Sequence, residues 1–285
     1  MFWEWYDKNY KKLIIIPTIL LLTFSGILIH HKVTTGEFVE KGIEFKGGTV
    51  ITISTDEQYD VQDLESKFSS ELGTDVVVRK INDIFGHTKA YEVSVDNVLD
   101  YDEAIDLVER LLGDVDVSIA NQEPSLGASF FRDAVKVLAV SFILISLVSF
   151  YYFRKFYSAL TIVVSAISDI IAIFAVMDLF GMKFSIATIG ALLMVLGYST
   201  DSNILLTTNI VKRKEGTISY RIKQTLKTEL TQDFAAYLVY FTMFFLSNVS
   251  IIKHIALILI LGIFFDEIFT LVLNNTLQRV IVEHA

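Results

Sequence analysis

The sequence contains no cysteine among its 285 residues. Disulfides, thiolate metal ligands and a cysteine nucleophile are therefore excluded. The sequence also lacks a glycine-rich phosphate loop of the form G-x-x-x-x-G-K-[ST], so we expect no nucleotide-driven motor in this chain. We expect neither a cofactor nor a metal site.

Basic side chains are scarce in one part of the chain. Residues 32–133 hold 22 acidic and 9 basic side chains, a net charge of −13, whereas the remainder holds 11 acidic and 15 basic ones, a net charge of +4. Nucleic-acid binding needs a basic face, so we expect no nucleic-acid partner. Hydrophobic residues make up 53% of the chain, too many for a soluble domain of this length. The composition predicts a polytopic membrane protein with one acidic soluble domain.

Six apolar stretches long enough to cross a bilayer organise the chain. An aromatic and basic segment, 1–12, precedes the first transmembrane helix at 13–31. An external domain follows at 32–133, the other five transmembrane helices occupy 134–273, and 274–285 form a cytoplasmic tail. These five spans are predicted at 134–152, 158–177, 184–206, 233–249 and 254–273.

Positively charged residues indicate the orientation, because Lys and Arg collect in cytoplasmic loops. They gather before the first span and after the second, fourth and sixth. We therefore expect a multi-pass protein of the cell membrane with both termini in the cytoplasm and residues 32–133 outside. Between the fourth and fifth spans, Ile218–Thr228 has the spacing of an amphipathic helix on the inner membrane surface, with a plain solvated connector as the alternative.

The external domain alternates strands and helices. Hydrophobic residues at period two or at helical spacing mark each element, and Gly86 marks a turn. The order is β-α-β-β-α-β, which is that of an α+β ferredoxin-like domain. That fold serves many purposes and indicates no function by itself. The predicted strands are 49–54, 75–82, 89–95 and 114–120, and the predicted helices are 60–72 and 100–112.

Four acidic side chains are predicted near the middle of the membrane: Asp201, Asp169, Asp266 and Glu267. At 1.5 Å per residue, Asp201 lies about 5 Å from the centre of its span. An ionised carboxylate there costs at least about 2.5 kcal/mol. The sequence places no Lys or Arg at this depth, so either another subunit supplies a cation or some of the acids are protonated. We predict a role in proton coupling for these four side chains; the alternative is that neutral acids hydrogen-bond between helices purely for packing.

Small residues share helix faces with these acids. Gly190 and Gly197 lie on the same face as Asp201, and Gly262 precedes Asp266 by one turn. Small residues let helices approach closely, so that buried polar groups find partners on neighbouring helices. We therefore expect close helix packing at these positions.

Three short motifs stand out along the chain. The first follows the first span and reads G-I-E-F-K-G-G-T, with Gly42, Phe45, Gly47, Gly48 and Thr49 as its marked residues. The second, Pro124-Ser125-Leu126-Gly127, closes the external domain. The third combines Gly197, Tyr198 and Ser199 with Asp201 and Asn203 in the fourth span.

Together these stretches resemble SecF, the smaller membrane subunit of the SecDF protein-export complex. The resemblance implies a fold of the resistance-nodulation-division (RND) superfamily, with SecD as a pseudo-symmetric partner. It also implies that the protein assists the SecY/SecE translocon in exporting a translocating polypeptide across the membrane, coupled to a cation gradient that is usually the proton motive force. In that family the acid of the fourth span is thought to take part in coupling, which points to Asp201.

The chain departs from bacterial members at three places, and one of these is the stretch Leu226-Lys227-Thr228-Glu229, where bacterial members carry an arginine just before the fifth span. The acid of its fourth span follows Gly197 by four residues instead of five, and the form Asp201-Ser202-Asn203 is closer to the D-A-N of SecD. Asp266 and Glu267 replace small residues. These departures suit an archaeal-type member.

Three other functions remain open. An RND-type exporter of lipids or small molecules usually has more spans and a second external loop, so this chain would need a partner. A non-energetic scaffold for the translocase would need no working relay. An intramembrane aspartyl protease would pair Asp169 with Asp201, but its G-x-G-D motif is absent and we expect no enzyme.

Overall fold

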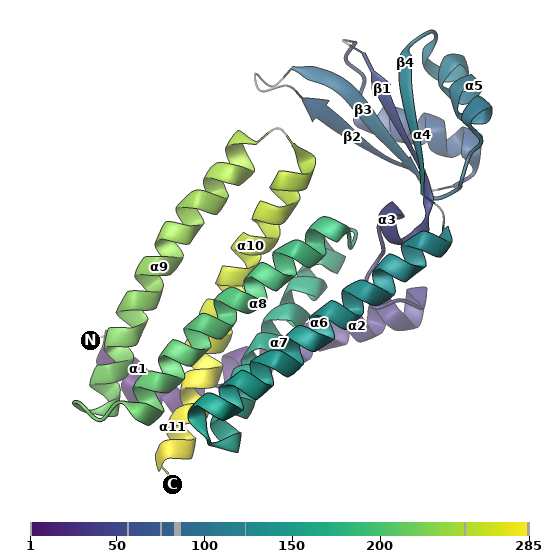
Figure 1. Cartoon of the computed structure of the whole chain (residues 1–285). Helices are drawn as coiled ribbons and strands as arrows, with labels where there is room; N and C mark the ends of the chain where they lie inside the picture. The colour runs from purple at the N-terminus through teal and green to yellow at the C-terminus, as the bar shows by residue number, and fades with distance from the viewer. Residues whose placement is uncertain are drawn as a thin grey trace.

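A computed structural model describes residues 2–55, 57–74, 76–82, 87–122, 124–247 and 249–283. Figure 1 shows a bundle of long helices with a small sheet unit at one end, and both chain termini at the other end. The turn predicted at Gly86 lies outside the described residues. The structure is thus mainly helical, with one small antiparallel sheet.

Long helices form the bundle. Within the described residues, five stretches are long and apolar enough to cross a membrane: Ile15–Thr35, Leu126–Phe153, Phe156–Leu179, Ile186–Lys212 and Ile251–Glu283. Each overlaps one of the predicted spans. The helices of the bundle are α1 (Phe2–Leu13), α2 (Ile15–Thr35), α6 (Pro124–Phe153), α7 (Phe156–Leu179), α8 (Ile186–Thr207), α9 (Ile218–Leu246), α10 (Ser250–Ile268) and α11 (Asn275–Glu283), and two π-helical segments, η1 (Thr208–Lys212) and η2 (Phe269–Asn274), continue α8 and α10.

Two regions differ from their predicted form. Ile218–Thr228 is neither a separate surface helix nor a connector, because it forms the first turns of the continuous helix α9. The segment predicted as a tail belongs to the bundle, since α11 packs there with Asn275 and Gln278 fully buried. Gln278 donates hydrogen bonds to groups on two other helices, which stabilises its polar side chain inside the bundle.

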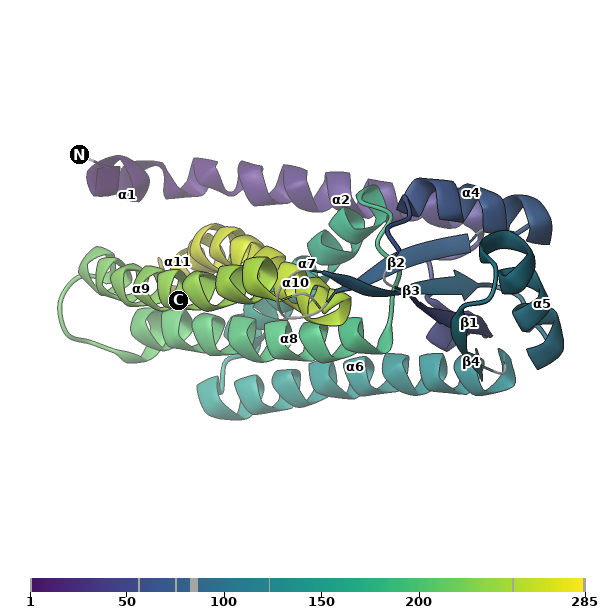
Figure 2. The same cartoon turned by 90° about the horizontal axis from the view of Figure 1, so that it is seen from above.

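Helix α7 is the centre of the bundle. Viewed from above, α2 runs along one edge and α6 along the other, with α7 between them (Figure 2). Most of α7 is buried, whereas much of α2 and α6 faces outward. At the end that holds the termini, Tyr6 of α1 packs against Leu206 and Leu226, which ties α1 to the α8–α9 junction.

The sheet unit contains four strands and two helices. The strands are β1 (Gly48–Ser54), β2 (Val76–Asn82), β3 (Thr88–Val95) and β4 (Asp116–Gln122), and the helices are α4 (Val61–Leu72) and α5 (Tyr101–Leu112). The strand order is β2-β3-β1-β4 and each neighbouring pair is antiparallel. Both helices share one hydrophobic core with the strands.

Local sequence explains these elements. The alternation predicted for β3 is confirmed, because Tyr91, Val93 and Val95 are all fully buried. Asp100 forms a capping box with Glu103 at the start of α5, which satisfies backbone N–H groups that the helix itself leaves free. In a strand, every second side chain lies on the same face, so a hydrophobic residue at every second position is enough to bury that face.

Candidate functional site

Two buried carboxylates lie inside the helix bundle. Asp169 of α7 is 0% exposed and Asp266 of α10 is 3% exposed. Both stand on mainly apolar helices, so packing removes them from water. A buried charged group is tolerated only with hydrogen-bond donors or a counter-ion. The neighbouring helices supply donors.

Hydroxyl groups are these donors. Ser199 Oγ of α8 donates to Asp169 Oδ2 at 2.5 Å, and Thr270 Oγ1 of η2 donates to Asp266 Oδ1 at 2.6 Å. Ser165 Oγ of α7 lies 3.5 Å from Thr270 Oγ1. The first two distances are typical of hydroxyl-to-carboxylate hydrogen bonds. We call these five side chains the carboxylate site.

A ladder of buried polar side chains continues from the carboxylate site toward the end of the bundle that holds the termini. Asn203 Nδ2 donates to the Ser199 carbonyl oxygen at 2.7 Å, and Asn274 Nδ2 donates to Asn203 Oδ1 at 2.6 Å. Gln278 Nε2 then donates to Thr207 Oγ1 at 3.2 Å. Polar contacts therefore run without a break along α8 and its neighbours.

The π-helical segment η2, which continues α10, carries two residues of this polar network. The segment η2 has the wider π-helical winding, which is rare and often occurs at functional sites. Thr270 and Asn274 both lie in it and both are fully buried. Asn274 and Gln278 could not be singled out from the sequence, because polar residues near the predicted end of a span are more often solvated.

Two further acids of α9 were also missed. Glu229 is 2% exposed and Asp233 is 3% exposed, and both are close enough to Asp266 to interact with it electrostatically. A signal was present, because Ile222, Leu226, Glu229 and Asp233 recur at the spacing of one helix face. The sequence prediction divided this region into a surface helix and a separate transmembrane span, so the spacing was not seen along one continuous helix.

Glu267 is half-buried and lies beside the same acids. Within the described parts of the chain, no Lys or Arg forms an ion pair with Asp169, Asp266 or Glu267. Buried Arg279 pairs instead with Asp7 at 2.6 Å. In the same described residues, no group of three or more His, Cys, Asp or Glu side chains gathers to hold a metal ion. Among the described residues, these acids therefore lie together without a Lys or Arg paired to them.

Asp201 lies apart from this region. It is exposed on the outer surface of α8, and Tyr198 beside it is half-buried, while Ser199 and Asn203 of the same helix point inward. The helical rotation of about 100° per residue explains the difference. The structure thus brings Asp169 and Asp266 together and leaves Asp201 on another face.

The glycines near Asp201 also face outward, and the expected packing is not found here. Gly190 and Gly197 are exposed, and a side-chain carbon added at either would meet no atom within 4 Å. At Gly262 the expected close approach is present, because an added carbon would lie 2.3 Å from Val195 Cγ2. Gly262 therefore permits tight packing of α10 on α8, whereas Gly190 and Gly197 lie on an open face of α8.

The first sequence motif forms the joint between the sheet unit and the bundle. The short helix α3 (Ile43–Lys46) carries Phe45, whose ring stacks on Phe184 with a centroid distance of 5.4 Å. Gly42 N donates to the Phe184 carbonyl oxygen at 2.8 Å. Gly127 in the first turns of α6 lies against the backbone of α3, where an added side-chain carbon would sit 2.8 Å from the Phe45 carbonyl oxygen. The first and second motifs therefore meet at one contact.

The last residues of the motif start the first strand. Gly47 and Gly48 have φ values of +83° and +144°, a region that L side chains rarely adopt. Thr49 is buried, and its Oγ1 donates to Asn121 Oδ1 and accepts from Leu99 N, both at 2.8 Å. These residues set the direction in which the sheet unit leaves the bundle.

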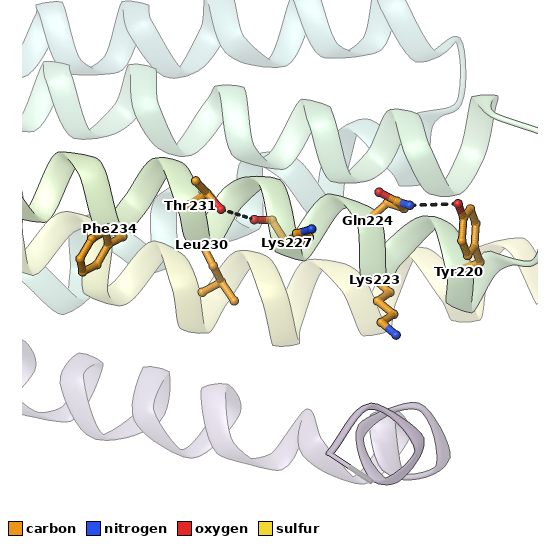
Figure 3. Close-up of a pocket in the computed structure, with 7 residues that line it drawn as sticks. All are labelled: Tyr220, Lys223, Gln224, Lys227, Leu230, Thr231 and Phe234. Carbon is orange, nitrogen blue, oxygen red and sulfur yellow. Dashed lines mark hydrogen bonds between the residues drawn. The ribbon is translucent and has the colours of Figure 1, made fainter.

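A shallow groove of about 780 Å³ follows one face of α9. Figure 3 shows its side chains along the helix, with Gln224 donating to the Tyr220 hydroxyl oxygen at 2.9 Å. One half is basic, with Lys223 and Lys227, and the other half is apolar. This division suits a helix that passes from a membrane surface into the bilayer. The lining contains no acidic side chain, so the groove differs in character from the carboxylate site.

Comparisons with known proteins agree with this architecture. The family model for "Protein export membrane protein SecD/SecF, C-terminal" matches residues 111–284, more than half of the chain. The protein-export membrane protein SecF of Pyrococcus furiosus is 34% identical over 282 residues, which cover 97% of this chain and 92% of that protein. SecF of Methanolacinia petrolearia is 33% identical, with 96% and 95% covered.

A solved structure shares the fold. The crystal structure of SecDF, a translocon-associated membrane protein from Thermus thermophilus, superposes with a TM-score of 0.77 at 21% identity. The match covers 98% of this chain, which spans about 38% of the length of that one. The family model, together with the shared fold, thus defines a polytopic membrane protein of the SecD/SecF class. The chain belongs to the SecF family of protein-export membrane proteins.

Proposed function

We propose that this chain is an auxiliary subunit of the Sec protein translocase, which assists export of polypeptides and couples it to the proton gradient together with SecD. Membership of the SecF family supports the export role. The buried acids supply groups that can take up and release a cation within the membrane.

The outward face of α8 is the observation that carries this proposal. Gly190, Met194, Gly197 and Asp201 recur at helical spacing and all four are exposed. An ionised carboxylate facing lipid near the bilayer centre costs at least about 2.5 kcal/mol. A second helix packed against this face would remove that contact with lipid, and glycines permit such close packing.

The second helix belongs to SecD in this proposal. A pseudo-symmetric partner would present an equivalent helix, and its polar groups would then pair with Asp201. The partner would complete an assembly that this chain forms only in part, which fits its coverage of 38% of the solved SecDF chain. The SecY/SecE channel and the emerging polypeptide are the further partners that we propose.

We assign six transmembrane helices by adding α9 to the five apolar stretches. Its 29 residues are long enough to cross a bilayer even though acids interrupt its apolar face. We assign the sheet unit to the ferredoxin-like class, since the β-α-β-β-α-β order and the strand order β2-β3-β1-β4 both support it. The basic residues favour cytoplasmic termini, with the sheet unit outside.

We also propose that the chain is not an enzyme. An intramembrane aspartyl protease would need Asp169 and Asp201 to face one substrate. The two side chains lie on different faces instead, one buried in the bundle and one outside it.

Cysteine cross-linking tests the partner face. The chain has no cysteine of its own, so one introduced residue gives one reactive site. We expect Gly197→Cys to form a cross-link with a cysteine scanned along SecD, while Leu147→Cys, exposed on α6, should form none. A cross-link from α6 and none from α8 would contradict the proposed interface.

Export assays with SecD present test the coupling. Asp201→Asn removes the charge and keeps the size, so we expect slower export that no longer responds to the proton gradient. The matched control is Asp133→Asn, another exposed acid on a bundle helix. If Asp201→Asn exports normally while loss of the whole subunit impairs export, the chain acts as a scaffold and the coupling role is wrong.

A further inference from the structure

A second groove opens between α2 and α6 at the end of the bundle nearest the sheet unit. Its walls are α2 and α6, and its floor is α7, which lies between them (Figure 2). The volume is about 700 Å³, within the range of pockets that hold small molecules. We call it the sheet-side groove. Its apolar lining comes in pairs from the three helices: Leu28 and Ile29, Phe131 and Val135, and Ile171 and Phe174.

The sheet-side groove faces the hydrocarbon of the membrane. Ile29 and Val135 are 59% and 48% exposed, so both walls present apolar side chains at its mouth. Ser25 and Lys32 of α2 both line it, and the rise of 1.5 Å per residue places them about 10 Å apart along the helix axis. One leaflet of the hydrocarbon core is about 15 Å deep. The groove therefore extends through most of one leaflet, where a hydrocarbon chain fills it better than water does.

Two lysines lie at the end of the groove nearest the sheet unit. Lys32 Nζ lies 3.9 Å from the centroid of the Phe38 ring, and Lys41 Nζ lies 4.6 Å from the centroid of the Phe131 ring. All four residues line the groove. An ammonium group is attracted to the face of an aromatic ring. These contacts hold both positive charges at the groove and keep them from extending into solvent.

The lysine end of the groove carries a positive charge. Among the described residues that line the groove, Glu37 is the only acid, and it pairs with Lys41 at 2.7 Å. Within the same described structure, no carboxylate forms an ion pair with Lys32. The rest of the external domain is acidic, since residues 32–133 have a net charge of −13. The groove therefore offers a local site for an anion, and lysine binds phosphate as a point charge.

We propose that the sheet-side groove binds one anionic phospholipid, with a hydrocarbon chain between α2 and α6 and the phosphate at Lys32 and Lys41. A phospholipid joins an anion to a hydrocarbon chain, in the order in which the groove changes from basic to apolar. Basic pockets between transmembrane helices bind anionic headgroups in this way. An apolar helix from another protein would fill the groove but would present no anion to the lysines.

The bound lipid would also support the joint between the sheet unit and the bundle. Phe131 and Phe184 line the groove, and both rings contact Phe45 of α3. The lipid would lie in the leaflet next to the sheet unit. This inference needs only a membrane-spanning bundle, so it is independent of the proposed coupling to the proton gradient.

Native mass spectrometry measures the preference for the anionic lipid. The full chain in detergent is titrated with phosphatidylglycerol or with phosphatidylcholine that has the same hydrocarbon chains. A lysine near a membrane surface strengthens binding to anionic lipid about 5-fold. We expect Lys32→Gln to weaken phosphatidylglycerol binding by about 5-fold, and Lys32→Gln together with Lys41→Gln by about 10- to 25-fold. Binding of phosphatidylcholine should not change.

Two further variants sharpen this measurement. Glu37→Gln should strengthen phosphatidylglycerol binding by about 2- to 5-fold, because it releases Lys41 and removes the acid beside the phosphate. A misfolded chain cannot give such a gain. The matched control is Lys67→Gln together with Lys89→Gln, which removes two exposed lysines of the sheet unit and should bind as the parent chain does.

Photo-cross-linking locates the hydrocarbon chain. A phosphatidylglycerol with a diazirine on one chain should label residues 25–29 and 131–138, and Val135→Trp should remove most of this labelling by filling the mouth of the groove. Equal labelling of all outward helix faces, or a preference for phosphatidylglycerol that survives the loss of both lysines, would identify ordinary surrounding lipid and overturn the proposal. Val135→Cys supplies the one cysteine of the chain. Its cross-linking to another protein in native membranes, without lipid labelling, would also overturn the proposal by identifying a protein as the occupant.

Discussion

At the joint between the sheet unit and the bundle, Gly127→Ala would have two opposing effects of known size, a gain in helix propensity and a steric clash with α3. Gly127 lies in the first turns of α6, where alanine is normally the better helix former by about 1 kcal/mol. The alanine carbon would lie 2.8 Å from the Phe45 carbonyl oxygen and 3.0 Å from the Glu44 carbonyl oxygen. Ordinary contacts of this kind begin at 3.4 Å. The backbone of α3 would therefore have to move by several tenths of an ångström.

The backbone of α3 is not free to move. Gly42 N donates to the Phe184 carbonyl oxygen at 2.8 Å, and Phe184 N donates to the Glu40 carbonyl oxygen at 2.7 Å. Phe45 is held against the rings of Phe131 and Phe184. Overpacking at such a site costs about 1–3 kcal/mol, more than the gain in helix propensity. Because these hydrogen bonds and ring contacts hold α3 in place, the upper part of this range applies, about 2–3 kcal/mol, and the gain of about 1 kcal/mol in helix propensity leaves a net loss of roughly 1–2 kcal/mol for Gly127→Ala.

Thermal unfolding of the detergent-solubilised chain, followed by circular dichroism, measures this difference. A loss of that size lowers the midpoint by about 2–8 °C for a chain of this length. The matched control is Gly26→Ala in α2, where an added carbon meets nothing within 4 Å. That variant should unfold at the same temperature or slightly higher.

Hydrogen exchange gives a local reading of the same perturbation. The amides of Gly42 and Phe184 should exchange faster in Gly127→Ala, because their hydrogen bonds belong to the displaced joint. Equal unfolding midpoints for Gly127→Ala and Gly26→Ala, with unchanged exchange at both amides, would refute the reasoning.

Three more substitutions test the packing and the polar ladder, each by the midpoint of thermal unfolding. Gly262→Ala should lower the midpoint, because the new carbon would lie 2.3 Å from Val195 Cγ2. Adding Val195→Ala should restore the midpoint, with a coupling energy of about 0.5–3 kcal/mol between the two positions. An equal effect of Gly262→Ala with Val195 and with Ala at that position would contradict this contact. Thr49→Val should cost about 1–3 kcal/mol, since it removes two buried hydrogen bonds of 2.8 Å each; a midpoint unchanged from the parent chain would contradict it. Asn203→Leu should cost a similar amount, about 1–3 kcal/mol, because Asn274 Nδ2 loses its 2.6 Å hydrogen bond and keeps only the 3.5 Å contact with Thr207 Oγ1. An unchanged midpoint would mean that the ladder contributes no stability.

Periodic patterns made the regular elements predictable. The alternation around Tyr91, Val93 and Val95 placed β3 and its buried side. The apolar runs placed five of the six predicted spans, whereas 233–249 is not among the stretches of the described residues that are apolar enough to cross a membrane. The end of α6 near the sheet was less predictable, because the helix begins at Pro124, ten residues before the predicted span. An apolar run marks the part of a helix that lies in lipid, whereas the hydrogen-bonded helix can extend well beyond it.

The acids show where prediction from the sequence ended. Asp169, Asp201 and Asp266 had the same status in the sequence, since each lies near the middle of a long apolar run. Their burial depends on how each helix is rotated against its neighbours. A rotation of about 100° per residue separates Asp201 from the buried Ser199 and Asn203 on the same helix. Glu229 joined the buried set only because α9 continues without interruption across two predicted segments.

The sequence by itself determined the membrane class, the approximate positions of five apolar spans, the strands and helices of the acidic domain, and the motifs that indicate the family. These are properties of hydrophobicity and spacing, which each segment carries alone. Only the tertiary structure decided that Asp169 and Asp266 share a site with hydroxyls from other helices while Asp201 faces outward. The physical reason is that hydrogen bonds between helices depend on rotation and contact, and neither is set by the composition of a single span.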